Sequence, residues 1–141
     1  MEQRCSDEVL ELHQFLEEWF NAKLPPTDEA YRRFSSVMAE EFILISPNGV
    51  LSEREELVDR LRDAHGMWRQ ASRPGRIWIE NLTVRHQVGD QAMVLYEEWQ
   101  EFEGEIRGRL STAVFRRRAG TPNDLEWLHL HEVWLPNQDL P

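Results

Sequence analysis

The strongest constraint on the fold is a change in the hydrophobic period at Ile77. From there onward apolar residues recur at every second position, which is the period of a strand with one buried face. The alternation runs through four long segments, residues 77–88, 91–102, 106–118 and 125–135. The first two connections between them are hairpin-sized and the third is a longer loop. We therefore expect an antiparallel meander, strongly curved because its strands are long.

The preceding half of the chain has the pattern of helices. A spacing of i, i+3, i+4 and i+7 predicts a first helix with the inner stripe Leu12, Phe15, Leu16 and Trp19. Ser6 is the expected N-cap of this helix, and Pro25 ends it near Leu24. Thr27 is the expected start of a second helix, which ends before Phe42.

A short strand and a third helix complete this half. Residues 42–45 form a run too short and too β-branched for a helix, so we expect a buried strand there. Ser46 is expected to cap the turn that follows. Ser52 and Glu55 have the spacing of a capping box. The helix that they begin should end at Gly66 and bury Leu57, Val58, Leu61 and Ala64.

Length and composition predict one domain. No linker or repeat divides the 141 residues, so we expect a single domain over 1–141 with a polar tail at 136–141. Cys5 is the only cysteine, which excludes an internal disulfide, and the acidic start is unlike a signal peptide. These features favour a cytoplasmic location. The formal charge of −10 repels nucleic acid and anionic lipid, so neither is an expected partner.

The order of these elements resembles the nuclear transport factor 2-like superfamily. Residues 42–49 and 89–96, and the pair of stretches 112–118 and 126–131, carry the resemblance. The later stretches are similar to the SnoaL-like branch and to the association domain of calcium/calmodulin-dependent protein kinase II. The resemblance implies a cystatin-like α+β cone, with three helices packed in a curved, mostly antiparallel sheet and a pocket between them. It implies no single activity, because the superfamily includes isomerases, cyclases, dehydratases, transport adaptors and assembly hubs.

Alternation and the resemblance together predict the side chains that face the pocket. Glu98 and Glu132 are the candidate catalytic pair, because two carboxyl groups in a partly dry cavity can split their pKa values into an acid and a base. The alternative is that both lie at the mouth of the cone, exposed or paired with Arg107 or Arg109. The candidate ligand-binding residues are Tyr96, Arg109, Ser111, Leu130 and Trp134.

Comparison with two branches of the superfamily narrows the expected classes of ligand and reaction. The kinase association domain has arginines that match Glu98, Ala113 and Glu132, and two of these positions are acidic here. A cationic or hydroxylated ligand is therefore favoured over an anion, unless Arg109 supplies the positive charge. Ser46 stands before Pro47 where steroid isomerases have a carboxylate base, which disfavours that chemistry.

Two functions of different class remain. The first is a small-molecule pocket protein without a cofactor, with lyase, isomerase or cyclase chemistry on an apolar, hydroxylated compound as the candidate reactions. The second is a non-catalytic binding or assembly module that works through its outer sheet face. The resemblance implies a homodimer through that face, and its expected contacts are Trp99, Leu110, Thr112, Trp127, His129 and His131.

Other chemistry-bearing residues are expected to be structural. His129 and His131 share one face of a strand, yet no third ligand accompanies them, so no metal site is predicted. His13 is either directed at the pocket or solvated on the face of its helix, and the solvated position is favoured. The tryptophans Trp19, Trp68 and Trp78 are expected in the core.

Overall fold

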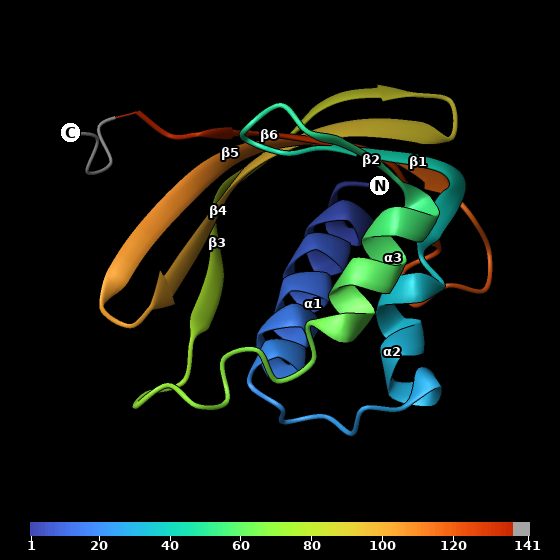
Figure 1. Ribbon diagram of the computed structural model, residues 1–141. Coiled ribbons are helices and arrows are strands. Elements are labelled where there is room, and N and C mark those ends of the chain that lie inside the picture. Colours follow the sequence, from blue (N-terminus) through green and yellow to red (C-terminus); the bar gives the residue numbers. More distant parts are fainter. Residues whose placement is uncertain (137–141) are drawn as a thin grey trace.

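The computed structural model describes residues 1–136, so the predicted polar tail beyond Pro136 lies outside the described residues. Its helices are α1 (Glu2–Phe20), α2 (Asp28–Ser35) and α3 (Arg54–Asp63). Its strands are β1 (Met38–Ile45), β2 (Leu51–Glu53), β3 (Arg76–Val88), β4 (Gln91–Phe102), β5 (Glu105–Arg117) and β6 (Leu125–Trp134). The predicted α+β architecture is confirmed: the helices lie on the concave side of one curved sheet (Figure 1).

The sheet has the strand order β2-β1-β6-β5-β4-β3. The meander from β3 to β6 is antiparallel, as the alternating pattern predicts, whereas β1 joins β6 in parallel. This parallel pairing makes β1 twice as long as the run 42–45, because the backbone from Met38 onward is held in the sheet. The short β2 is an additional antiparallel partner of β1. Ser46 caps the turn between them as expected, since its Oγ accepts from the Val50 amide at 3.1 Å.

Both ends of α1 differ from the predicted ones, and α3 ends at Asp63, before the predicted Gly66. Helix α1 starts at Glu2 instead of after a Ser6 cap, because buried Cys5 and Val9 continue its inner stripe upstream. It ends at Phe20, before the Pro25 stop, where Ala22 takes a left-handed turn with φ +58°. Thr27 caps α2 as predicted.

The capping box of α3 is displaced by one residue from the predicted one. It is formed by Glu53 and Glu56, not by Ser52 and Glu55. The reason is the pairing of β2, which holds Ser52 opposite Leu44 and directs its hydroxyl to Arg60. The sheet therefore decides where the third helix begins.

A β-bulge in β6 places Trp127 on the opposite face of the sheet from the predicted one. The β5–β6 register passes from Val114↔His129 to Phe115↔Trp127, so Leu128 has no partner of its own and the alternation of β6 is broken there. Trp127 is consequently on the concave side and fully buried, not on the outer face. The other five residues predicted on the outer face lie there, and none of them is buried: Trp99, Leu110, Thr112, His129 and His131.

Two of the three tryptophans predicted in the core are buried there. Trp19 packs between Phe15 and Tyr31, and Trp68 is held by Phe20 and Phe102. Trp78 is the exception: its ring stacks on Trp99 on the outer face of the sheet, with 13° between the planes. The pairing Trp78↔Trp99 explains this position, because directly opposed residues of antiparallel strands project from the same face.

The inward position of Trp127 completes a network around Glu8, which is fully buried on α1. Its carboxylate accepts hydrogen bonds from the Trp127 indole at 2.9 Å, from Asn123 at 3.0 Å and from both terminal nitrogens of Arg33. These donors come from β6, the loop before it and α2. One buried anion thus joins both helices to the far end of the sheet.

We expect Glu8→Ala to lower the free energy of unfolding by about 3 kcal/mol or more, because it leaves buried donors without an acceptor. Glu11→Ala is the matched control, since Glu11 is half-exposed at 53% and shares Arg33 and Asn123 as partners. Its cost should stay within about 1 kcal/mol. Urea unfolding of both variants measures the difference, and equal costs would contradict a structural role for the buried anion.

Candidate active site

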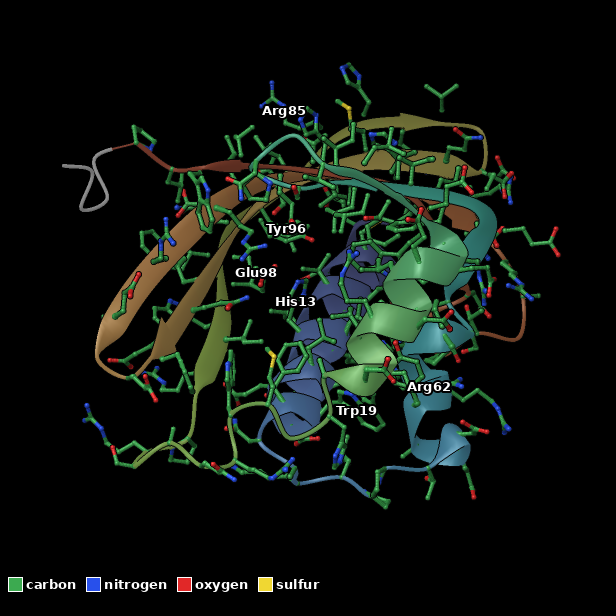
Figure 2. All side chains as sticks on the ribbon, viewed as in Figure 1. His13, Trp19, Arg62, Arg85, Tyr96 and Glu98 are labelled. Carbon is green, nitrogen blue, oxygen red and sulfur yellow. The ribbon has the colours of Figure 1, made fainter. Side chains whose placement is uncertain are left out.

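An apolar cavity of about 260 Å³ lies between the helices and the concave face of the sheet. Three of the predicted site residues with charged side chains line it, together with Leu130. Figure 2 shows His13 and Glu98 facing each other across this region, from α1 and from the sheet. The apolar residues of the wall are Leu12, Leu16, Phe20, Phe34, Met38, Phe42, Leu44, Leu57, Leu61, Trp127 and Leu130. The polar residues are His13, Ser46, Arg60, Glu98, Gln100, Arg109 and Glu132.

The strand register brings the predicted charged residues together. Glu98 on β4 is directly opposite Arg109 on β5, and Glu132 on β6 is opposite Ser111, two residues further along β5. Arg109 Nη1 donates to Glu132 Oε1 at 3.1 Å. Arg109 therefore stands between two carboxylates that are each only 5% exposed. The alternative of exposed carboxylates at the mouth of the cone is wrong, although the pairing of Glu132 with Arg109 that it included is present.

His13 is the functional residue that the sequence interpretation placed wrongly. It is 4% exposed, and its Nε2 lies 3.1 Å from Glu98 Oε1 while its Nδ1 lies 2.7 Å from the Val9 carbonyl oxygen. The Val9 carbonyl oxygen only accepts hydrogen bonds, and Glu98 does so as a carboxylate of lowered pKa; both ring nitrogens therefore donate, and the ring, whose pKa is raised, is an imidazolium. The signal for this position was the spacing of Val9, Leu12, His13 and Leu16, which puts the imidazole on the apolar stripe of α1.

Glu98 is held as a permanent anion. Burial alone would raise its pKa, but the charge and hydrogen bond of His13 and the charge of Arg109 outweigh burial and lower the pKa to about 2. Its second oxygen accepts from Gln100 Nε2 at 2.6 Å. In return Glu98 raises the pKa of His13, although burial by itself would lower it. The two residues form a buried ion pair with both carboxylate oxygens occupied.

The pKa of Glu132 is shifted in the opposite direction from that of Glu98. Burial and the negative charge of Glu98 raise its pKa to about 7, and these effects exceed the stabilisation of its anion by Arg109. Among residues 1–136 no donor bonds its second oxygen, Oε2. The two carboxyl groups of the cavity are thus split into one fixed anion and one group that titrates near neutral pH.

Tyr96 and Ser111 lie deeper than the cavity wall. Both are fully buried on paired positions of β4 and β5, and Tyr96 packs edge-on against His13 at 5.6 Å. Neither hydroxyl oxygen makes a hydrogen bond of normal geometry within the described structure, although Ser111 is close enough to stabilise the Tyr96 phenolate slightly. Burial raises the pKa of Tyr96 well above its ordinary value, so its hydroxyl stays protonated. These residues support the cavity from behind.

Trp134 belongs to a second hollow of about 310 Å³ outside the cavity. The two spaces share Gln100 and Arg109 as wall residues. The guanidinium groups of Arg107 and Arg109 lie over the Trp134 ring, 4.1 and 5.1 Å from its centroid. Of the predicted ligand-binding residues, therefore, Arg109 and Leu130 line the cavity, Trp134 lies at its outer side, and Tyr96 and Ser111 lie behind it.

The described residues contain neither a cluster of metal ligands nor a helix that could span a membrane. Within residues 1–136 no group of three or more His, Cys, Asp or Glu side chains is placed to hold a metal ion, His129 and His131 included. None of the three helices combines the length and the hydropathy needed to cross a bilayer.

Comparison with known proteins assigns the chain to a family. The sequence profile of the sucrose-6-phosphate phosphohydrolase C-terminal family matches residues 5–136. The chain belongs to this family. It is 26% identical over 128 residues to probable sucrose-phosphatase 3a of Arabidopsis thaliana and 27% identical over 130 residues to sucrose-phosphatase 1 of Nicotiana tabacum. Each match covers 91% of this chain but only 29% and 30% of the relatives, so the family domain is less than a third of their length.

Solved structures show the fold of this family domain. An NTF-2-like protein of unknown function from Pseudomonas aeruginosa superposes with a TM-score of 0.81 at 24% identity, over 94% of this chain and 98% of that one. The S. rosetta CaMKII hub superposes with a TM-score of 0.58 at 17% identity, over 86% and 92% of the two chains. The resemblance to the nuclear transport factor 2-like superfamily is confirmed. At these identities the likeness is one of fold alone.

The raised pKa of Glu132 predicts how stability depends on pH. Because the folded state favours the neutral acid, its contribution is complete below about pH 4.5 and is lost as the pH rises through about 7. Between these values the free energy of unfolding of the unmodified protein should fall relative to that of Glu132→Gln, which cannot ionise. Urea unfolding at a series of pH values measures this difference.

Glu40→Gln is the control for this experiment, because Glu40 is exposed on β1 and its side chain makes no hydrogen bond or ion pair within residues 1–136. Identical profiles for Glu132→Gln and the unmodified protein would show that folding does not raise the pKa of Glu132.

Proposed function

We propose that the cavity binds a small molecule with an apolar body and one hydroxyl group, and that the hydroxyl donates a hydrogen bond to Glu132 Oε2. The observation that carries this proposal is the position of Glu132 in the cavity wall: Arg109 occupies its Oε1, and no hydrogen bond to its Oε2 comes from residues 1–136. This oxygen can therefore accept a hydrogen bond from a hydroxyl group in the cavity. The surrounding wall of leucine and phenylalanine favours an apolar remainder.

Glu132 is also the residue best suited to exchange a proton with such a ligand. A pKa of about 7 lets a carboxyl group act as an acid or a base near neutral pH. Glu98 is unsuited to this role, because its low pKa and its two hydrogen bonds keep it ionised. We therefore narrow the predicted acid and base pair: Glu132 carries the proton, and Glu98 holds the charge that raises the pKa of Glu132. Lyase, isomerase and cyclase reactions that begin with a proton transfer use a group of this kind.

The names of the relatives suggest sucrose and its 6-phosphate as competing ligands. A disaccharide carries many hydroxyl groups, and each one that is buried needs a hydrogen-bond partner. Apolar side chains outnumber polar ones in the cavity wall, and both carboxylate oxygens of Glu98 are already hydrogen-bonded within the protein. We expect neither sugar to occupy it.

Heptan-2-ol is a suitable probe, since it joins one hydroxyl to an apolar chain. Binding to the native state alone stabilises it, by about 2.7 kcal/mol at a concentration of ~100 Kd, so the Tm of the unmodified protein should rise with alcohol concentration. At about pH 8, above the pKa of Glu132, the substitution Glu132→Gln should weaken binding roughly tenfold, because a charge-assisted hydrogen bond is lost. Differential scanning fluorimetry with Glu40→Gln as control measures both effects.

Sucrose at the same concentrations should leave the Tm unchanged, apart from a gradual rise common to all variants. A site-dependent effect of sucrose and none of heptan-2-ol would overturn the apolar ligand class. Heptan-2-amine tests whether the pocket prefers a cationic ligand. Tighter binding of the amine than of the alcohol would contradict the proposal that the ligand carries a hydroxyl group at this position.

Assembly through the outer sheet face is the second candidate function. The observation in its favour is a set of apolar side chains on that face: the Trp78–Trp99 stack, with Ile106 46% and Val133 45% exposed nearby on β5 and β6. We propose that a second copy of the chain covers these residues, together with Leu110, Thr112, His129 and His131. This interface is independent of the cavity.

Val133→Lys should convert the dimer to a monomer in sedimentation velocity, because a lysine in the middle of an apolar interface is buried without a partner. Val88→Lys is the matched control: Val88 is 76% exposed at the tip of the β3–β4 hairpin, away from the proposed contact. A monomeric unmodified protein, or equal dissociation by both variants, would contradict the interface.

A further inference from the structure

We infer that the ligand of the cavity also carries an anionic group, a carboxylate or a phosphate, which binds in the outer hollow between Arg107 and Arg109. The inference rests on the proposed function, because it assigns the second end of the same ligand. It names a substrate class: amphipathic hydroxylated acids or their phosphate counterparts, with the hydroxyl close to the anionic group and the apolar chain inside the cavity.

The inner cavity and the outer hollow adjoin each other. Gln100 and Arg109 line both the inner cavity and the outer hollow, so a group attached to a molecule in one space can reach the other. Arg109 marks this junction, and its Nη1 donates to Glu132. A ligand hydroxyl at Glu132 Oε2 would therefore lie on the inner side of the arginine, with its neighbouring substituent directed outward.

Arg107 and Arg109 are arranged so that both can bind one anion. They are two residues apart on β5 and project from the same face, and Trp134 lies beneath both guanidinium groups. Stacking on an indole fixes the plane of a guanidinium and leaves its N–H edge free for an acceptor. Arg107 has one ion pair in the described structure, with Glu105 at 3.7 Å between exposed side chains, and such a pair is weak. Donors for an anion are thus in place and little used.

The charge lining the cavity and the hollow is positive. The cations are Arg60, Arg107, Arg109 and the His13 imidazolium, and the acids are Glu98, Glu105 and Glu132. Since burial favours the neutral form of Glu132, this excess of positive charge is larger below about pH 7, in a protein whose formal charge is −10. The hollow is also partly apolar, with the stacked pair Trp68 and Phe102 at 5.3 Å in its wall. A wall of this kind weakens solvent screening and strengthens an arginine–anion contact.

Three probes separate the parts of this ligand. Heptan-2-ol has the hydroxyl and the chain, 3-hydroxyoctanoate adds a carboxylate beside the hydroxyl, and 2-hydroxyheptyl phosphate adds a phosphate at the same place. Isothermal titration calorimetry at pH 6.5 should show at least tenfold tighter binding of one of the two anions than of the alcohol. The tighter anion identifies the carboxylate or the phosphate class.

Arg107→Gln is the test of position. It should abolish most of the advantage of the anion and leave the affinity for heptan-2-ol within about twofold of the unmodified protein. Arg85→Gln is the matched control, because Arg85 is an exposed arginine of β3 that lies on the outside of the molecule, away from the cavity (Figure 2). It should leave the affinities for all three probes unchanged.

The outcomes distinguish this inference from the proposed function. Equal affinities for the alcohol and both anions, or an anion preference that survives Arg107→Gln, would overturn the inference while the cavity ligand stands. Failure of all three probes to bind would overturn the proposed function itself.

Discussion

Four ionisable side chains can be buried beside an apolar cavity only if each of them has a charged or hydrogen-bonding partner. His13 and Glu98 form a buried ion pair at 3.1 Å, and Arg109 donates a hydrogen bond to Glu132 at 3.1 Å beside the charge of Glu98. Every one of these groups would lose hydration energy without regaining it if its partner were absent. The compensation depends on α1 lying against the concave face, so the packing of the helix and the chemistry of the site have the same origin.

The two carboxyl groups differ in their hydrogen bonding, and this difference separates their pKa values. Glu98 has a cationic partner of its own and a glutamine on its other oxygen, whereas Glu132 shares Arg109 with the charge of Glu98 nearby. Both oxygens of Glu98 are therefore hydrogen-bonded, whereas only one oxygen of Glu132 is. A carboxyl group with an unused oxygen in an apolar cavity is a typical place for a ligand to bind. Arg109 connects this carboxyl group to Arg107 and Trp134 in the outer hollow.

Periodicity predicted the four long strands nearly to the residue, because half-buried antiparallel strands must alternate and turns must interrupt them. It also predicted that Glu98, Arg109 and Glu132 share one face. Trp127 shows where the method fails: a single-residue bulge reverses the alternation, and nothing in the local sequence 125–130 marks it. The start of α3 was displaced for a related reason, because pairing with β1 drew residues 51–53 into the sheet.

The sequence by itself determined the fold class and the chemical inventory: an acidic domain with an apolar helix stripe, a meander and carboxylates on its inner face. Only the tertiary structure decided which charges meet, because ion pairing depends on contacts between residues far apart in the chain. His13 and Glu98 are 85 positions apart, and the sequence interpretation favoured solvent over the pocket for the imidazole. Which glutamate remains an anion and which one titrates follows from those contacts and from burial, and neither is a property of the local sequence.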